Sequence, residues 1–395
     1  MADNFTTTTN VWFLDRIKSS LKNIVGWAVL IIVAIGLLYW NEWRSLQTAQ
    51  SWDEVSKLVV EVPSDTVDAN NNGKLVYTQW DVQTTESVDD ATFDIPAITG
   101  AIALVRHAEM YQWKEKASTK TKDNVWWSQT KTTTYSYEKE RSSKLIKSSE
   151  FSEEKWHENP GMMRYESTED RVASATLGAF TLSPTQIVSI HRARAYPYTA
   201  EMLAKASSDI QYRGVVNDGK LYMGRVEKAS LDTPTIGDTR ITWSLVPVWP
   251  VSLMAEQNNN TFVAFQTEAG DQIDTLVDGK VSKNAMIASA QESNKMLTRG
   301  IRIGGIFAII MGFYMIFSII VTISSVIPML GWIADAGVGI VVGLMGLAVG
   351  ILTIAIAWFR FRPVAAIIML VIVAAIVWWI RYKKRWTMVK TPTIM

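Results

Sequence analysis

The residue types that usually carry catalysis or metal binding are scarce in this 395-residue chain. It has no cysteine and only three histidines, His107, His157 and His191. Thiolate nucleophiles, disulfide bonds and zinc sites with cysteine ligands are therefore excluded. His107 and Glu109 match the His-x-Glu of zinc deaminases, but that chemistry also needs cysteine ligands. We expect these two residues to be a buried polar pair within a strand, and we expect no metal site.

The motifs of common nucleotide-binding and hydrolytic sites are also absent from the sequence. It has no Gly-x-x-x-x-Gly-Lys-Ser/Thr loop, no His-Glu-x-x-His and no Gly-x-Ser-x-Gly. Gly337, Gly339 and Gly343 slightly resemble a dinucleotide fingerprint, but they lie in an apolar run with no preceding strand. A net charge of +1 gives no reason to expect nucleic-acid binding. We expect no catalytic residue, no cofactor and no nucleic-acid partner.

The composition instead indicates a membrane protein with a large polar segment. The chain is 48% hydrophobic yet 19% charged, which is possible because its apolar residues are gathered in runs. Four uncharged runs occur, at residues 24–40, 303–326, 336–359 and 364–380. About 20 helical residues cross a bilayer, so the sequence predicts four transmembrane helices. The first run is not followed by an Ala-x-Ala cleavage site, which favours an uncleaved signal anchor over a signal peptide.

The basic residues predict the orientation of these spans. Three precede the first run, and five lie in the tail at 381–395, which has no acidic residue. By the positive-inside rule, segment 1–23 and the tail are cytoplasmic and residues 41–302 are exoplasmic. Residues 11–22 are amphipathic and predict a short interfacial helix, while an unstructured tail is the alternative for residues 1–10.

The exoplasmic segment combines helical ends with a strand-rich middle. Helical spacing at 45–60 and 282–302 extends the first two spans, and alternation predicts strands at 102–114 and 239–256. The turn residues at 217–219 and 258–260 predict hairpins. Both faces of 102–114 carry polar groups, so we expect a central strand whose Arg106 and Glu109 are each paired. The predicted fold class is α+β, with four transmembrane helices and a large mixed exoplasmic domain between the first and second.

A stripe of small residues follows one face of the third predicted span. It consists of Gly339, Gly343, Gly346 and Gly350. Small residues at this spacing let helices approach closely in lipid. We expect the stripe to join copies of the chain into a homo-oligomer; packing against another span of the same chain is the alternative.

Several motifs, taken in chain order, carry a resemblance to a known family. The most specific block contains Arg106, His107, Glu109, Met110, Tyr111, Gln112, Trp113 and Glu115. The weaker ones include Asn41-Glu42-Trp43-Arg44, His157 with Asn159-Pro160, and Gly237-Asp238 with Arg240. The sequence resembles the transmembrane protein 43 family, also called LUMA, and its bacterial relatives. Trp43 stands where the family has glycine, which suggests a distant, prokaryotic member.

The resemblance implies four spans, cytoplasmic or nucleoplasmic termini, a large luminal domain and a role as a self-associating membrane organiser. For a bacterium this means the inner membrane with a periplasmic domain; for a eukaryote, the endoplasmic reticulum and inner nuclear membrane. The family has no established catalytic residues, so the resemblance implies none in this chain. Animal members associate with lamins, and we do not expect lamin binding of a bacterial protein.

The function expected from these observations is a non-enzymatic membrane scaffold. Its expected partners are the lipid bilayer and further copies of itself, with other membrane proteins undetermined. Two function classes remain as alternatives. One is an oligomeric channel or solute conduit, and the other is a hydrolase of lipid or envelope substrates that uses acids such as Glu109 or Asp238.

The predicted topology can be tested with reporter fusions. A reporter fused after Ala206 should be active only in its exoplasmic form, and one fused after Met395 only in its cytoplasmic form. The physical reason is the basic tail, which is retained on the cytoplasmic side during insertion. The opposite pattern at both sites would refute the topology.

Overall fold

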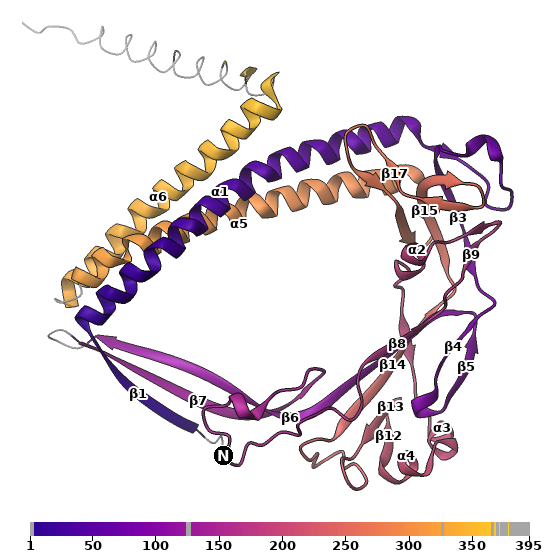
Figure 1. Ribbon diagram of the computed structural model, residues 1–395, viewed down its shortest axis with the longest axis horizontal. Helices are drawn as coiled ribbons and strands as arrows, with labels where there is room; N and C mark the ends of the chain where they lie inside the picture. The colour runs from indigo at the N-terminus through magenta and orange to yellow at the C-terminus, as the bar shows by residue number, and fades with distance from the viewer. Residues whose placement is uncertain are drawn as a thin grey trace, which may run out of the picture. The chain divides into compact units, whose positions relative to one another are not determined.

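A computed structural model describes residues 4–123, 128–324, 328–364, 367, 368, 371 and 378 (Figure 1). The chain forms two compact units. The strand-rich unit comprises Met1–Thr9, Asp53–Thr121 and Lys131–Ser289. The helical unit comprises Asn10–Trp52, Lys122–Thr130 and Ala290–Met395.

The helices of the described residues include three long ones and several short ones. The α-helices are α1 Phe13–Leu58, α2 Pro184–Val188, α3 Ala200–Lys205, α4 Ser208–Arg213, α5 Lys283–Ser324 and α6 Pro328–Phe361. The 3-10 helices are η1 Ala69–Asn71, η2 Ala91–Phe93 and η3 Ser148–Glu150.

The strands are mostly short, with β6 and β7 as the longest. The first ten are β1 Asn4–Trp12, β2 Val60–Glu61, β3 Leu75–Gln83, β4 Ser87–Asp90, β5 Ile95–Thr99, β6 Ala101–Asp123, β7 Ser128–Ser142, β8 Thr168–Arg171, β9 Thr176–Leu177 and β10 Phe180–Thr181. The others are β11 Arg194–Tyr196, β12 Gly214–Asn217, β13 Lys220–Met223, β14 Thr239–Pro247, β15 Pro250–Asn258, β16 Thr261–Val263, β17 Phe265–Gln266, β18 Gln272–Ile273 and β19 Thr275–Asp278.

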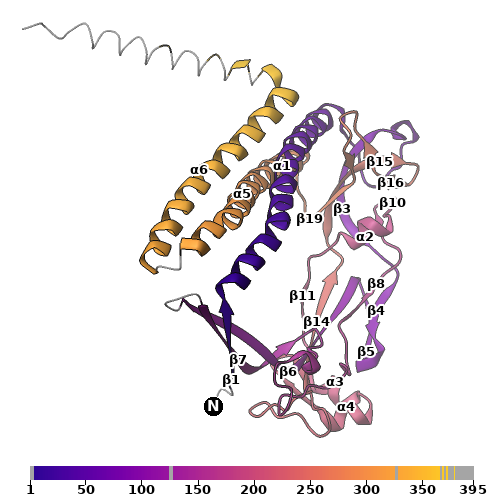
Figure 2. The same cartoon turned by 60° about the vertical axis from the view of Figure 1, so that its left-hand side comes forward.

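The helical unit is built on α1, α5 and α6, which lie side by side in both cartoon views (Figures 1 and 2). Three stretches of the described residues are long and apolar enough to cross a membrane: Ile24–Leu58, Lys283–Ser318 and Gly337–Phe361. The fourth predicted span, 364–380, lies mostly outside the described residues. The helical spacing at 45–60 and 282–302 is confirmed, since α1 and α5 run through these segments almost completely.

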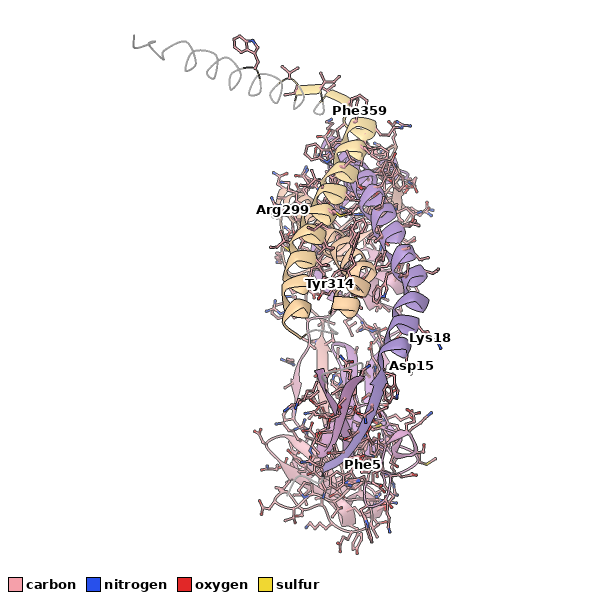
Figure 3. All side chains as sticks on the ribbon, turned by 90° about the vertical axis from the view of Figure 1, so that its left-hand side faces the viewer. Phe5, Asp15, Lys18, Arg299, Tyr314 and Phe359 are labelled. Atoms are coloured by element: carbon pink, nitrogen blue, oxygen red, sulfur yellow. The ribbon has the colours of Figure 1, made fainter. Side chains whose placement is uncertain are left out.

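The prediction for the N-terminal segment is wrong at its start. Residues 4–12 form strand β1, which pairs with β7, and α1 begins at Phe13. The β-branched threonines at 6–9 favour an extended chain once a partner strand is present. Phe5 adds a ring contact to Tyr135 of β7, with centroids 6.1 Å apart. Asp15 and Lys18 lie in the first turns of α1 (Figure 3).

Two sheets organise the strand-rich unit. Within the described residues, one runs β1-β7-β6-β14-β13-β12, with β8 beside β6 and β11 beside β14. The other runs β19-β15-β16-β10-β9-β3-β2, with β15 also paired to β3. Both predicted hairpins are confirmed. Asp218 and Gly219 have φ of 49° and 67° between β12 and β13, as a type I′ turn requires, and β15 pairs with β16 after Asn258.

The predicted single strand at 239–256 is wrong, because it is two strands in different sheets. The register shifts at Pro247, and β15 begins at Pro250. Proline lacks the N–H that a continuous ladder needs, so the chain leaves the first sheet and enters the second. This break places β14 beside β6 and β15 beside β3.

The core of the strand-rich unit surrounds a buried ion pair. Trp243 packs against Phe93 and Tyr198, with ring centroids 5.3 and 5.0 Å apart. Arg106 is 8% exposed and donates from Nη1 to both oxygens of Asp90, at 2.7 and 2.9 Å. Trp243 Nε1 donates to Asp90 Oδ2 at 2.8 Å. The prediction that β6 is a central strand with a paired Arg106 is confirmed.

This pair gives a graded test of stability. Arg106→Ala leaves the Asp90 carboxylate buried without its cation, which costs about 3–5 kcal/mol. Glu109→Ala removes a pair whose side chains are each one-third exposed and should cost about 0.2–1 kcal/mol. The thermal unfolding midpoints of the two purified variants should therefore fall by clearly different amounts. Equal losses would contradict the assignment of the Asp90 pair as the buried anchor.

A cationic pocket between three helices

A buried carboxylate joins α1, α5 and α6. Glu42 lies two residues after the apolar run of α1 and is 1% exposed. Its Oε1 accepts from Arg302 Nε of α5 at 2.6 Å, and its Oε2 accepts from Arg302 Nη2 at 2.6 Å. Trp358 Nε1 of α6 donates to Oε2 at 2.7 Å. Three helices that are far apart in sequence thus meet at one charged group.

A second polar layer lies beside this carboxylate. Arg44 donates to the side-chain oxygens of Asn294, Asn41 and Thr298, at 3.1, 3.3 and 3.1 Å. Asn294 in turn donates to the backbone oxygen of Ser45 at 2.9 Å, and both Asn294 and Thr298 are buried. These three acceptors are neutral, so the Arg44 charge is stabilised by amide and hydroxyl dipoles.

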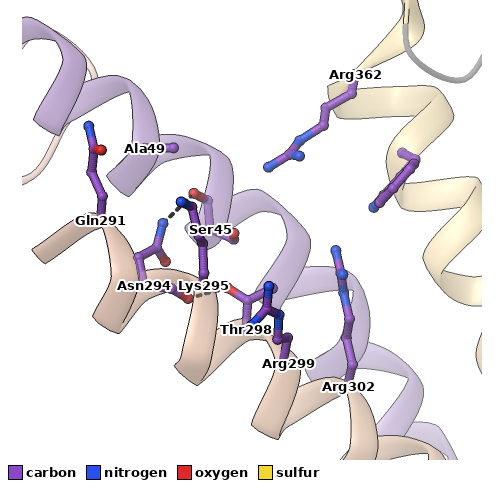
Figure 4. A pocket seen from close by; sticks show the side chains of 10 residues that line it. Ser45, Ala49, Gln291, Asn294, Lys295, Thr298, Arg299, Arg302 and Arg362 are labelled. Carbon is purple, nitrogen blue, oxygen red and sulfur yellow. Dashed lines mark hydrogen bonds between the residues drawn. The ribbon is translucent and has the colours of Figure 1, made fainter. Parts of the chain in front are cut away.

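A pocket of about 500 Å³ opens next to these two layers (Figure 4). Its lining comes from α1, α5 and the C-terminal end of α6: Ser45, Ala49, Gln291, Asn294, Lys295, Thr298, Arg299, Arg302, Trp358 and Arg362. Figure 3 shows Arg299 on α5 from the side. The guanidinium carbons of Arg302 and Arg362 lie 5.5 and 5.9 Å from the Trp358 ring centroid. Four cations and one indole therefore surround a single space.

Close contacts at glycines hold the helices that carry this pocket. A Cβ at Gly346 or Gly350 of α6 would lie 2.5 or 2.6 Å from the side chains of Ile310 and Ile306 of α5. Likewise, a Cβ at Gly305 of α5 would lie 2.5 Å from Leu38 of α1. The predicted stripe is thus divided, because no described atom lies within 4 Å of a Cβ built at Gly339 or Gly343.

The residues of the most specific motif lie in the strand-rich unit, where they connect strands and loops. Glu109 Oε2 accepts from Arg240 Nε and Nη2 at 2.9 and 2.5 Å across β6 and β14. His107 is exposed, so the expected buried His107–Glu109 pair is wrong. The reason is the strand alternation, which turns the even-numbered residues, including Met110, toward the core.

The second half of this motif fixes the loop that follows β7. Buried Gln112 donates to the backbone oxygen of Lys144 at 3.0 Å and accepts from the backbone N–H of Ile146 at 2.8 Å. The backbone N–H of Trp113 donates to Asn159 Oδ1 at 2.7 Å, and Asn159 Nδ2 donates to the backbone oxygen of Trp113 at 2.9 Å.

Glu115 and the ring stack beside it complete this region. Glu115 Oε2 accepts from the Tyr137 hydroxyl at 2.7 Å. Burial and this bond to Glu115 raise the pKa of Tyr137 to about 12. His157 stacks on Tyr137 with ring centroids 3.8 Å apart. His191, the third histidine, is exposed.

The remaining motif residues shape the turn before β14. Asp238 Oδ1 accepts from Arg225 N and Thr235 Oγ1, and its Oδ2 accepts from Thr235 N, all at 2.8–2.9 Å. Gly237 has φ of 99°, which favours glycine, and its N–H donates to the Tyr111 carbonyl at 2.9 Å. Among the described residues, no cluster of three or more histidine and acidic side chains could hold a metal ion.

Sequence reasoning placed Glu42 and Arg44 only as residues of a family motif and missed their assembly with Arg302 and Trp358. A signal was present: an acid and a base lie within four residues of the end of the first apolar run, and Arg302 directly precedes the second. Opposite charges at the ends of neighbouring spans occupy similar depths in a membrane, so they are natural partners.

These features define an integral membrane protein with apolar spanning helices and a large strand-rich unit between the first two. The family model described as Transmembrane protein 43 matches residues 110–363, and the chain belongs to this family.

Curated relatives match almost the whole chain. Transmembrane protein 43 of mouse is 27% identical over 367 residues, covering 90% of this chain and 88% of the relative. The human protein is 26% identical, covering 92% and 90%. The Drosophila melanogaster homolog is 23% identical, covering 91% and 94%. No solved structure matches the chain. The family resemblance seen in the motifs is therefore confirmed.

The three-helix junction predicts a non-additive mutational effect. Glu42→Ala leaves the Arg302 guanidinium and the Trp358 N–H without their acceptor, which costs about 3–5 kcal/mol. Adding Arg302→Met should restore part of this loss, because no lone charge is then left in the junction. Thermal unfolding of the two single variants and the double variant in detergent measures this coupling. Strictly additive losses would contradict a direct Glu42–Arg302 interaction.

Proposed function

We propose that this protein is a non-enzymatic membrane scaffold that self-associates and thereby organises the bilayer and the proteins around it. The observation that most supports self-association is that only half of the glycine stripe on α6 contacts another described helix of the chain. Gly346 and Gly350 are filled by isoleucines of α5, whereas Gly339 and Gly343 continue the same stripe without a described neighbour. A second copy of the chain is the partner that we assign to this free half.

The surroundings of the free half suit contact between helices in lipid. Ile340 and Leu344 flank it and are 67% and 65% exposed. Since lipid tails are as apolar as these side chains, burial alone gives helices no reason to associate. Close backbone approach at small residues supplies the attraction instead, through packing that a lipid chain fits less well.

The state of the acidic motif residues supports a structural role over hydrolysis. Glu109 is bound by Arg240 through two nitrogens, and both carboxylate oxygens of Asp238 accept hydrogen bonds from a local turn. These are the acids that a hydrolase would use, and here they connect strands and close a turn.

The orientation and location of the protein are part of the same proposal. We take residues 41–302 to be exoplasmic because of the basic residues near the chain termini. A bacterial inner membrane, with this unit in the periplasm, remains a prediction from the motif departures, because the relatives reported above are animal proteins.

Two matched double variants test self-association. Gly339→Leu/Gly343→Leu adds bulk where no described atom is near, so the chain should fold and insert but form smaller particles. Gly346→Leu/Gly350→Leu meets α5 directly and should destabilise the chain by about 1–3 kcal/mol or more through overpacking. Size-exclusion chromatography with light scattering measures particle mass, and thermal unfolding measures stability.

An unchanged mass for Gly339→Leu/Gly343→Leu would overturn this interface. Conductance of wild-type protein in liposomes separates the scaffold from the channel alternative, because a scaffold leaves the bilayer resistance unchanged.

A further inference from the structure

The pocket between α1, α5 and α6 holds more positive charge than its own carboxylates balance. Arg44, Lys295, Arg299, Arg302 and Arg362 line it or lie beside it. Glu42 is the buried acid there, and both of its oxygens are bound by Arg302. We propose that this pocket binds an anionic phosphate group, such as that of a phospholipid headgroup or of a free phosphate ester. The proposal does not depend on self-association.

The charge imbalance is built into the sequence. Residues 336–361 of α6, which include the end that lines the pocket, contain no acidic residue, so this part of the helix supplies no counterion. Among the described residues, Arg299 and Arg362 form no ion pair, and Lys295 reaches only the exposed Glu292 of its own helix, at 3.6 Å. Like charges that share a partly buried pocket repel one another, so the site is more stable with an anion inside it.

The arginines are arranged as phosphate-binding groups usually are. Glu42 occupies Nε and Nη2 of Arg302, which fixes the guanidinium plane and leaves Nη1 for a ligand. Guanidinium groups bind phosphate oxygens through paired N–H donors, which makes them better suited to this anion than isolated ammonium groups. Both the Arg302 and the Arg362 guanidinium lie within cation–π distance of the Trp358 ring, which favours their positions at the pocket.

The size and depth of the pocket favour a phosphate attached to a larger molecule. Its volume of about 500 Å³ is within the range of ligand sites and exceeds what one phosphate needs. The apolar runs of all three helices end here, at residues 40, 303 and 359. Lipid phosphates lie where the hydrocarbon region ends, so a phospholipid headgroup can reach the pocket without leaving the bilayer.

Lipid retention by the purified full-length protein tests this site. The protein in detergent is titrated with phosphatidylglycerol and with phosphatidylcholine, and bound lipid is counted by native mass spectrometry. Wild type should prefer phosphatidylglycerol, and Arg299→Gln/Arg362→Gln should weaken its binding about tenfold or more, because two charge-assisted contacts are lost. Lys120→Gln/Lys205→Gln removes the same charge from exposed positions of the strand-rich unit and should bind as wild type.

A second arm separates the two sources of phosphate. Inorganic phosphate and glycerol 3-phosphate are added while the thermal unfolding midpoint is measured. Stabilisation that is lost in Arg299→Gln/Arg362→Gln, without a preference for phosphatidylglycerol, supports the site with a free phosphate ester as its ligand. Arg299→Lys/Arg362→Lys keeps the charge and should bind with intermediate affinity, which keeps the test valid if the glutamine variant does not fold. Equal binding by wild type and both pocket variants in both arms overturns the proposal.

Discussion

A carboxylate at the end of a membrane span needs its partners in fixed places, and Glu42 has three donors from two other helices. Removing such a group from water costs several kcal/mol, which only well-aligned donors offset. A slip of one helical turn moves a side chain by about 5.4 Å, more than any of these bonds can stretch. The junction therefore fixes the axial position of α5 and α6 against α1, and with it the geometry of the basic pocket.

Tight helix contacts work together with this junction. Gly305 lies against Leu38, and Gly346 against Ile310, with room for no side chain. These contacts set the distance between helix axes, whereas Glu42 sets their rotation. Neither is sufficient alone, because apolar packing in lipid tolerates rotation and a long arginine tolerates variation in distance.

Much of the fold followed from local patterns. Apolar runs indicated the spanning helices, alternation indicated β6, and the Asp218-Gly219 turn indicated a hairpin. The incorrect predictions have a common physical cause: the structure of these segments is decided by a partner strand that is distant in sequence. Strand β1 exists because β7 pairs with it, and the chain between β14 and β15 changes sheet where prolines interrupt the ladder.

The site was harder to predict than the fold. The sequence shows that Glu42, Arg44 and Arg302 lie at the ends of apolar runs, but a helix presents each residue to only one direction. Which polar residues meet depends on how the helices are rotated against one another, and neither apolar run shows this by itself. The stripe was recognised as a packing surface, yet its division at Gly346 depends on where α5 passes.

The order of synthesis gives the Glu42 junction a further meaning. Glu42 leaves the ribosome 260 residues before Arg302 and 316 before Trp358. Throughout that interval the nascent chain carries an unpaired acid beyond its first apolar run while most of the strand-rich unit is synthesised. Completion of the third helix closes the junction, so a truncated or arrested chain keeps an exposed charge within reach of quality-control proteases.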